Sequence, residues 1–459
     1  TFSTGHSVGA IAQALYDPRP DRAIINSQGA DFNTAFENTL ELLHGKQPFF
    51  EAGFRAGGVL AFADVMLPLG RGAWKMVEVK SSASIKDYQF DDVAIQHFVA
   101  TQSGVKLKSL ALAHVNSKWV YPGAGDYRGL LVETDVTVEA ASRASDVKIW
   151  IAEAHATADK RREPSVRTGA HCSDPFDCGF TDYCTAQEPQ AVHPVTWLPK
   201  VQTKALKAHL ADPAVTELAQ VPDTLLNPSQ QRVKVVSLSG VTHFDRTGAS
   251  LALKPHKLPA YFLDFESINP AVPLWAGTRP YQQIVFQFSC HRQSRNGTLE
   301  HREFLHEGSD DPSDALAAAL LAACDASTSS APIFVYYASF ERTRIEELAV
   351  RLPRRRKSLL SLAARLVDLL PIVRDNYYHP SQQGKWSIKR VLPALVPDLT
   401  YDQLDEVQNG GGAQDAYMEI IAPETTRERK AQRTRQLRDY CALDTLAMVR
   451  IRDALLSNQ

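Results

Sequence analysis

The sequence predicts an α/β fold arranged in two domains. The chain has 459 residues, which is too long for one ordinary hydrophobic core. In both halves, short apolar runs of strand length alternate with segments of helical period, and a Pro-rich stretch separates the halves. We therefore expect an N-terminal domain over residues 1–190, a connector over 191–256 and a C-terminal domain over 257–459.

The N-terminal domain is predicted to contain two adjacent strands followed by a helix. The strands are the apolar runs Val59–Leu67 and Trp74–Val79, joined by the turn sequence Gly70-Arg71-Gly72. The helix is predicted to begin near Asp91-Asp92, because acidic residues favour the first turn of a helix. This order, two hydrophobic strands and then a helix, is typical of an α/β core.

The connector and the C-terminal domain are predicted element by element from the same patterns. In the connector, we expect a short helix over Lys204–Leu210 and a strand-like piece over Val233–Leu238. In the C-terminal domain, the apolar runs predict strands over 260–268, 281–291, 302–307 and 333–337, with a helix over 315–323. The chain ends in a predicted helix, in which Leu437, Tyr440, Asp444, Met448 and Ile451 recur at helical spacing.

Composition and charge exclude several classes of protein. No apolar run approaches the roughly 20 residues that span a bilayer, so we expect no membrane segment. The net charge of −2 excludes a uniformly basic coat for nucleic acid, although not a local basic groove. Three of the six cysteines fall within residues 172–184, unlike the spread pairs of a secreted disulfide framework. We therefore expect a cytoplasmic protein. Because the sequence begins at Thr1 and not at a Met, we also expect a segment upstream of it.

The first candidate site combines Asp64, Glu78 and Lys80. Side chains at i and i+2 of a strand share one face, so Glu78 and Lys80 project together, and Asp64 on the neighbouring strand can join them. Two carboxylates are suitable ligands for Mg²⁺ or Mn²⁺, and a nearby ammonium can neutralise developing charge. The alternative is an ordinary strand pair with a surface salt bridge.

The second candidate site combines acids from three distant segments. Asp264 and Glu266 again occupy positions i and i+2 of an apolar strand, so their side chains share one face. Glu341 lies on the apolar face of a predicted helix. Asp444 lies on the buried face of the last helix, with Tyr440 one turn before it. Such close like charges destabilise a fold unless cations neutralise them. Two divalent ions about 3.5–4 Å apart would do so. The alternative is a domain that is retained for binding or structure.

A cysteine window is the third candidate site. Cys172, Cys178 and Cys184 are spaced C-x5-C-x5-C, and thiolates are suitable ligands for iron–sulfur clusters and zinc. Such sites usually need four ligands. His171 could complete a zinc site, and free structural cysteines are the other alternative.

Residues 1–190 resemble the RecB-type PD-(D/E)XK nucleases, which include the AddB subunit and the exonucleases of CRISPR adaptation. The resemblance rests on His6, Asp64, Glu78, Lys80 and Gln96, which match in order the His, Asp, E-x-K and Gln of that family. It implies a restriction-endonuclease-like core, with His6, Asp64 and Glu78 at the metal and Lys80 and Gln96 as catalytic residues. It also implies a [4Fe–4S] cluster, held by the three cysteines of the window and a fourth cysteine upstream of the core.

Residues 257–459 resemble the DEDD exonucleases of the tyrosine subclass, which have an RNase H-like fold. "LDFES" resembles the first motif and "YCALD" the third. The resemblance implies that Asp264, Glu266, Glu341 and Asp444 bind metal and that Tyr440 positions the nucleophilic water. Glu341 departs from the pattern, because most members have Asp there. The whole chain resembles a bacterial family of poorly defined function that joins both modules.

Several further residues are weaker candidates for contact with substrate. Lys389 could reach a substrate, Asp368 could support the second site or cap a turn, and Arg438 stands near Tyr440 in a basic run. A solvated helix face is the common explanation of such runs.

We therefore predict a metal-dependent nuclease that uses Mg²⁺ or Mn²⁺ to hydrolyse DNA, with single-stranded or frayed ends preferred. By resemblance, it would act in DNA repair or in defence against foreign DNA. The sequence does not identify a partner helicase. Two alternatives remain: a nucleic-acid-binding scaffold in which one or both sites are inactive, and an exonuclease whose C-terminal module processes RNA.

Overall fold

The protein is a mixed α/β structure with 45% helix and 18% strand, which confirms the predicted fold class. The computed structural model describes residues 2–25, 32–402, 404, 406–407 and 409–457. The chain divides into two compact units. Unit 1 comprises Thr1–Glu188 and Asn269–Gln282, and unit 2 comprises Pro189–Ile268 and Gln283–Gln459. Within the described residues, no helix combines the length and the apolar character that a membrane crossing requires.

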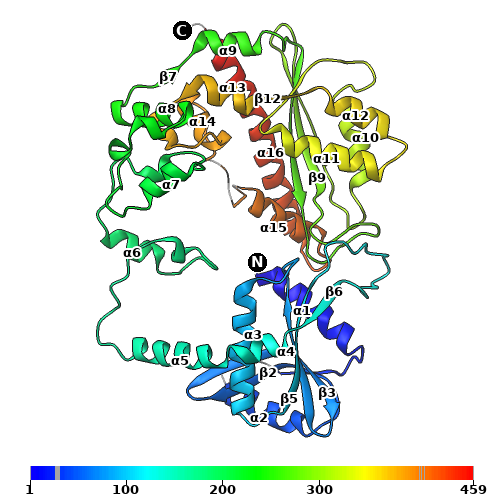
Figure 1. Ribbon diagram of the computed structural model, residues 1–459. Helices are drawn as coiled ribbons and strands as arrows, with labels where there is room; N and C mark the ends of the chain where they lie inside the picture. The colour runs from blue at the N-terminus through cyan, green and yellow to red at the C-terminus, as the bar shows by residue number, and fades with distance from the viewer. Residues whose placement is uncertain (1, 26–31, 403, 405, 408, 458–459) are drawn as a thin grey trace. The chain divides into compact units, whose positions relative to one another are not determined.

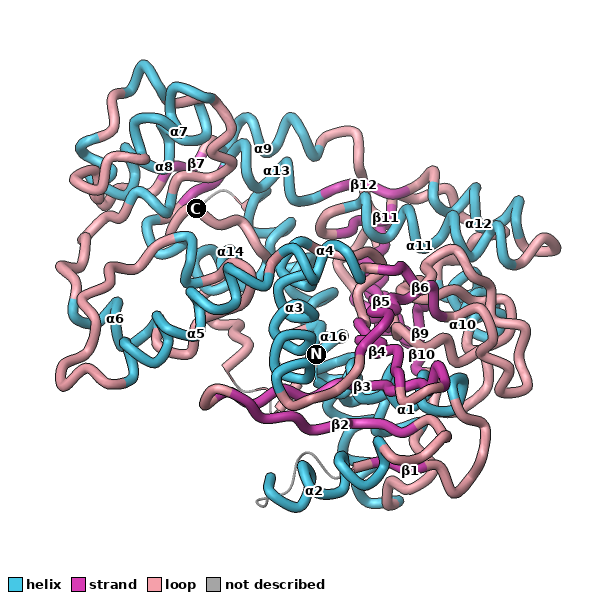
Figure 2. The backbone as a smooth tube through the Cα atoms, turned by 60° about the horizontal axis from the view of Figure 1, so that its bottom comes forward, coloured by secondary structure: helices cyan, strands magenta, loops and turns pink. Residues whose placement is uncertain are grey.

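Unit 1 is built on a six-stranded mixed sheet in which sequence order and spatial order agree. Figure 2 shows its strands side by side. β1 and β2 are parallel, as are β4 and β5, and the other neighbours are antiparallel. The strands are β1 (Ala23–Ile24), β2 (Phe49–Ala56), β3 (Val59–Gly70), β4 (Ala73–Lys80), β5 (Leu107–Val115) and β6 (Leu131–Asp135). The predicted strand pair is confirmed as β3 and β4.

Helix α3 (Asp87–Gln102) packs against β2, β3 and β5 and presents its buried residues to the core of unit 1. It begins earlier than predicted, because the Gln89 side chain accepts a hydrogen bond from the backbone N–H of Lys86 and so caps the first turn. Asp91 and Asp92 therefore lie inside the helix. The other helices are α1 (Phe2–Tyr16), α2 (Phe32–Leu43), α4 (Thr137–Ser142), α5 (Ala144–Ala158) and α6 (Thr181–Gln187).

The segment Asn269–Gln282 completes unit 1, although it follows β8 in the chain. Ala271 is buried in a small core with Val8, Val115 and Leu130. Backbone bonds add to this packing: the N–H of Gly277 donates to the carbonyl of Tyr121 at 2.8 Å. The N-terminal domain thus consists of two separate stretches of the sequence, which the predicted boundaries did not include.

Unit 2 is built on a five-stranded sheet with the order β10-β9-β8-β11-β12. β8 pairs antiparallel with β9 and β9 antiparallel with β10, whereas β8, β11 and β12 are parallel, so β9 alone runs against the other four strands of this sheet. The strands of the unit are β7 (His243–Phe244), β8 (Ala260–Ile268), β9 (Ile284–Gln293), β10 (Leu299–Leu305), β11 (Ile333–Val335), β12 (Leu366–Asp368) and β13 (Tyr377–Tyr378).

Helices cover both faces of this sheet. Figure 1 shows α16, in red, on one side and α10 to α12, in yellow, on the other. The helices are α7 (Lys204–Leu210), α8 (Pro228–Ser239), α9 (Arg246–Leu253), α10 (Ser313–Ala323), α11 (Ala338–Arg351), α12 (Arg356–Ala363), α13 (Leu369–Asn376), α14 (Ile388–Leu395), α15 (Gly410–Ile421) and α16 (Arg427–Leu456). The predicted helix over Lys204–Leu210 is confirmed as α7.

The predicted connector is part of unit 2. Leu206, Leu218 and Val233 are fully buried and belong to the same hydrophobic core as Phe262 of β8. The prediction of a strand-like piece over Val233–Leu238 is wrong, because these residues lie in α8. Asn227 caps that helix by accepting from the backbone N–H of Gln230 at 3.0 Å, and this cap outweighs the β-branched residues that follow.

The substitution Ala271→Asp tests whether Asn269–Gln282 is an integral part of unit 1. It would bury an unpaired carboxylate beside Val8 and Leu130, at a cost of about 2 kcal/mol or more. We expect faster hydrogen exchange in α1 and β5, measured by mass spectrometry of peptides. Ala276→Asp, an exposed position of the same segment, is the matched control. Equal exchange rates in the two variants would contradict the assignment.

Candidate functional site

Strand β8 positions two carboxylates on the face of the sheet that α16 covers. Along β8, Ala260 and Phe262 pack into the core that contains Met448 of α16, whereas Tyr261 and Leu263 pack into the core of the opposite face. Because strand side chains alternate, Asp264 and Glu266 follow Ala260 and Phe262 toward α16. The close approach of the Asp264 and Glu266 ligand oxygens agrees with the prediction that both side chains share one face of the strand.

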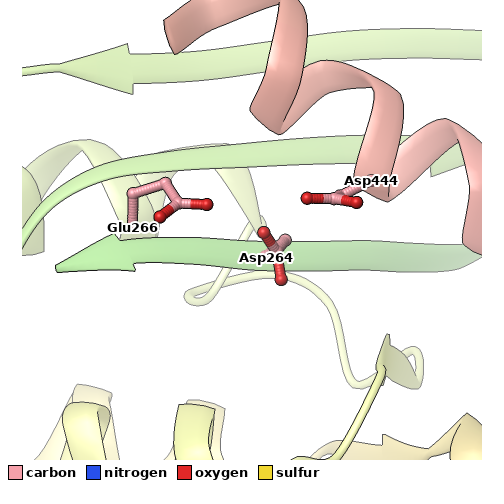
Figure 3. Close-up of side chains that lie close together, drawn as sticks. All are labelled: Asp264, Glu266 and Asp444. Carbon is pink, nitrogen blue, oxygen red and sulfur yellow. The ribbon is translucent and has the colours of Figure 1, made fainter. Parts of the chain in front are cut away.

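Helix α16 supplies the third carboxylate. Ligand oxygens of Asp264, Glu266 and Asp444 all lie within 4.8 Å of one another, and among the residues that the structure describes this is the one group of three with such geometry. Figure 3 shows Asp264 and Glu266 on the strand, with Asp444 directed at them from the helix. Residues 180 positions apart in the sequence thus meet at one point.

Two of these carboxylates are buried and that of Asp264 is half-buried, and the pKa values of all three are raised. Glu266 and Asp444 are each 7% exposed. Burial, together with the charge of Asp444, raises the pKa of Glu266 to about 8. Burial raises the pKa of Asp444 to about 6 although Tyr401 donates a hydrogen bond to it. Burial and the three neighbouring acids raise the pKa of Asp264 well above its usual value. Without a cation the site is therefore electrostatically costly.

Glu341 lies on α11 outside the group of three. Its side chain is 2% exposed, and its Oε2 atom has no hydrogen-bond partner among the described residues. Burial raises the pKa of Glu341 to about 8, and its charge contributes to the raised pKa of Asp264. A cation bound at the neighbouring acidic group would satisfy this unpaired buried carboxylate oxygen.

Asp368 holds the start of α11, the helix that carries Glu341. Its carboxylate accepts hydrogen bonds from the backbone N–H groups of Tyr337 and Ala338 at 3.1 and 3.0 Å, and from that of Leu370 at 3.0 Å. Of the two roles that the sequence left open, capping is therefore the one observed. It positions Glu341 indirectly.

Two tyrosines and a lysine surround Asp444. Tyr401 donates a short hydrogen bond to its carboxylate, and Tyr440 is 5% exposed one turn earlier on α16. Lys389 donates to the hydroxyl of Tyr440, with 3.3 Å between Nζ and Oη. Tyr401 was missed in the sequence because it stands in a segment without periodicity, where its distance in sequence from Asp444 gives no signal.

In unit 1, the predicted acids, Lys80 and Gln96 form a connected network. Lys80 Nζ lies 2.8 Å from Glu78 Oε1, and Gln96 Nε2 donates to Glu78 Oε2 at 2.9 Å. The carboxylate of Asp64 accepts from the backbone N–H of Val79 at 2.7 Å. Burial raises the pKa of Asp64 to about 6 and that of Glu78 to about 8, with the neighbouring acids adding to both.

The structure adds two acids to this site and gives His6 a less central position. Lys80 also forms a short ion pair with Asp92 of α3, and the charges of Glu51 and Asp92 both raise the pKa of Asp64. Glu51 has a backbone φ of 60°, which is uncommon for a non-glycine residue. His6 lies on α1, which packs against β3 and β4, and its side chain is exposed. The acidic pattern around Asp91-Asp92 could have identified Asp92, but it was assigned to the helix start.

The three cysteines line one pocket of unit 1. Its volume is about 790 Å³, and Cys172, Cys178, Cys184 and His171 all contribute to its wall. Within the described chain, no three of these four side chains bring ligand atoms within 4.8 Å of one another. Ligands in a zinc tetrahedron with Zn–S bonds of about 2.3 Å lie roughly 3.8 Å apart, so this is not a preformed zinc tetrahedron.

Three arginines in the basic run of α16 form ion pairs within the protein. Arg429 and Arg433 each form ion pairs with Glu406 and Glu419. Arg438 forms ion pairs with Glu303 and Glu307. These arginines therefore stabilise unit 2.

Comparisons with known proteins cover part of the chain. A family model described as a domain of unknown function (DUF2779) matches residues 261–387, a range that contains Asp264, Glu266 and Glu341 and ends before Lys389. The "Uncharacterized protein MG366 homolog" of Mycoplasma pneumoniae (strain ATCC 29342 / M129 / Subtype 1) is 26% identical to this chain over 210 residues. That alignment covers 41% of this chain and 31% of the relative's length. No solved structure matches the chain.

The raised pKa values predict a pH-dependent stability in the absence of divalent ions. The pKa of Glu266 rises from 4.5 to about 8 on folding, so the folded state binds more protons than the unfolded state across that window. Stability should therefore fall as pH rises from about 4.5 to about 8, by up to about 1.4 kcal/mol per pH unit for each such group. Denaturant unfolding in EDTA measures this change. Glu266→Gln should reduce the slope, and Mn²⁺ should restore stability near pH 8. A free energy of unfolding that changes neither with pH nor on addition of Mn²⁺ would argue against a cation site.

Proposed function

We propose that this protein is a metal-dependent nuclease with two catalytic modules, which hydrolyses phosphodiester bonds of DNA with a preference for single-stranded or frayed ends. Unit 1 would be a RecB-like module and unit 2 a DEDD-type module. The observation that carries the proposal is the group of half-buried Asp264 with buried Glu266 and Asp444, whose ligand oxygens lie within 4.8 Å of one another. Such an enzyme would act in the cytoplasm, in DNA repair or in defence against foreign DNA.

The topology of unit 2 supports the DEDD-type assignment. Its central sheet is mixed, and β9 alone runs against the other four strands, an arrangement compatible with an RNase H-like domain. The acids come from the central strand β8, from α11 and from the last helix, in the chain order that the resemblance implies.

The donor set of unit 2 fits divalent metal ions. Carboxylate oxygens are the ligands that Mg²⁺ and Mn²⁺ prefer, and the buried Oε2 atom of Glu341 lacks a protein partner in the described chain. Asp264, Glu266 and Asp444 would hold a metal, with Glu341 nearby. When bound, the ions would neutralise phosphate charge and promote ionisation of the attacking water.

The protein's own residues would orient the reaction in unit 2. Tyr440 lies beside Asp444 with its hydroxyl oxygen occupied by Lys389, which leaves the hydroxyl proton to be donated toward the carboxylate or the attacking water. The burial of Glu266 and Asp444 excludes bulk solvent, so charges placed there interact more strongly than in water.

The network in unit 1 supports a second hydrolytic site. Asp64 and Glu78 would hold the metal, with His6 by resemblance. Gln96 fixes the Glu78 carboxylate by donating to it. Lys80 lies between Glu78 and Asp92, where its ammonium could neutralise charge on the phosphate during attack.

For the cysteine window, we propose a [4Fe–4S] cluster. The thiols of Cys172, Cys178 and Cys184 face one pocket of about 790 Å³, and thiolates are the usual ligands of such clusters. Cys290, Cys324 and Cys441 are buried in unit 2, so the fourth ligand would be the upstream cysteine that the resemblance implies, and His171 in the wall of the same pocket is the alternative.

A nuclease assay tests both modules together. The full chain would be incubated with 5′- and 3′-labelled single strands of DNA and of RNA, in Mn²⁺ or EDTA. We expect Asp264→Asn and Lys80→Ala each to abolish a different product ladder, with activity at that site lowered at least about 100-fold, because each removes a charge from a buried site. Glu346→Gln on the exposed face of α11 and Lys108→Ala on β5 are the matched controls.

The ladders also decide between the alternatives. Metal-dependent binding of strands without any cleavage would favour a binding scaffold, and a ladder on RNA alone would make the active module an RNA exonuclease. If neither substitution alters cleavage by the wild-type chain, the assigned sites are wrong.

Iron analysis tests the cysteine window. Protein purified without oxygen should contain iron and acid-labile sulfide, and Cys178→Ser should lose most of both because one of few ligands is removed. Ser173→Ala, an exposed neighbour, should retain them. His171→Ala asks whether histidine is a ligand. Absence of iron from the wild-type protein, or bound zinc instead, would refute the cluster.

A further inference from the structure

Lys389 is held at the acidic group of unit 2 by an anchored segment. It is the second residue of α14, and the residues before it are fixed by hydrogen bonds: Tyr336 donates to the carbonyl of Trp386 at 2.7 Å. Gly384 packs so closely that a Cβ there would lie 1.7 Å from the carbonyl oxygen of Trp197. The start of α14 is therefore positioned by the core of the unit.

The ammonium of Lys389 lies between two tyrosines that contact Asp444. Its Nζ atom is 4.8 Å from the ring centre of Tyr440 and 5.3 Å from that of Tyr401. It also donates to the Tyr440 hydroxyl at 3.3 Å. These contacts hold a flexible side chain in one place, at a cost in rotamer entropy that an exposed lysine avoids.

Lys389 is also the cation whose charge reaches two of the acids. Its positive charge lowers the pKa of both Glu266 and Asp444. Arg438, the other candidate from the sequence, is exposed and paired with Glu303 and Glu307. A phosphate that approached Glu266 and Asp444 would therefore also experience the positive charge of Lys389.

We propose that Lys389 binds a nonbridging oxygen of the phosphate to be cleaved and holds that phosphate beside Asp264, Glu266 and Asp444. The inference rests on the proposed nuclease function. An ammonium has three N–H donors, so the bond to Tyr440 is compatible with a second bond to a phosphate oxygen. Lys389 thus couples substrate binding to the orientation of the Tyr440 hydroxyl.

The test uses the full chain carrying Lys80→Ala, so that cleavage reports on unit 2. In this background, Lys389→Ala is compared with Arg390→Ala, which removes a positive charge from the next, exposed position of α14. We expect Lys389→Ala to raise KM about tenfold and to lower kcat about tenfold, because it removes the phosphate contact and the bond to Tyr440. The slope of log KM against log salt should fall by roughly 0.7 to 1, as for one lost phosphate contact. Lys389→Arg should restore KM to within about threefold, because the charge remains.

A binding measurement without substrate shows that the site is folded. Titration with Mn²⁺ in a calorimeter should give an affinity for Lys389→Ala that is no weaker than that of the parent, since a nearby positive charge has been removed. Asp264→Asn should lose the part of this binding that belongs to unit 2 and keep the part that belongs to Asp64 and Glu78 of unit 1.

The outcomes separate the inference from the proposed function. Unchanged KM, kcat and salt slope in Lys389→Ala, with activity lost in Asp264→Asn, would refute the role of Lys389 and leave the nuclease site intact. Equal changes of KM and kcat in Arg390→Ala and Lys389→Ala would show that any nearby positive charge has this effect, and would also refute the role of Lys389. Full activity in Asp264→Asn would remove the proposed function of unit 2, and the inference with it.

Discussion

The contact between β8 and α16 determines the architecture of unit 2. The alternation of β8 separates its residues into one set that packs against α10 and α11 and another that faces α16. The second set begins with Ala260 and Phe262 and continues with two carboxylates, so the hydrophobic core lies directly beside the acidic group. Burial of Glu266 and Asp444 in a wall of apolar residues is unfavourable by itself. The surrounding hydrophobic contacts must be strong enough to hold them there, which explains why the site lies at the centre of the unit.

The two candidate sites manage buried negative charge differently. In unit 1, the protein supplies its own cation: Lys80 pairs with Glu78 and Asp92, and the backbone of Val79 satisfies Asp64. In unit 2, Tyr401 and Tyr440 supply neutral hydroxyls, and Lys389 bonds to Tyr440. A divalent ion entering unit 1 would have to compete with Lys80 for Glu78, whereas in unit 2 it would relieve a repulsion that the protein leaves in place. We therefore expect unit 2 to have the stronger dependence of stability on metal.

Strands β3, β4 and β8, and the acids that they carry, could be predicted because their signal is local. A period of two places Asp264 with Glu266, and Glu78 with Lys80, without any knowledge of the rest of the fold. Tyr401 could not be predicted in this way, since its role depends on a contact with Asp444, which is distant in the sequence. Asp92 belongs to a visible acidic pair, but the local pattern indicated a helix start and not its ion pair with Lys80. The prediction of a strand over Val233–Leu238 followed its β-branched residues and did not consider the cap at Asn227, which begins the helix. The predicted domain boundaries differ from the observed units for the same reason, namely that the deciding contacts join residues distant in the sequence. No local pattern indicates that Ala271 packs against Val8.

The insertion of Asn269–Gln282 into unit 1 has a thermodynamic consequence. The segment joins β8 to β9, whose antiparallel pairing holds its two ends close together in unit 2. A loop closed at its ends has less conformational freedom to lose when it packs, so the pairing of β8 with β9 lowers the entropic cost of completing the core around Ala271. If β8 and β9 separated, the segment would become a long flexible connection and unit 1 would lose part of its buried surface. The stabilities of the two units are therefore linked through the chain itself, and the strand that carries Asp264 and Glu266 is the link.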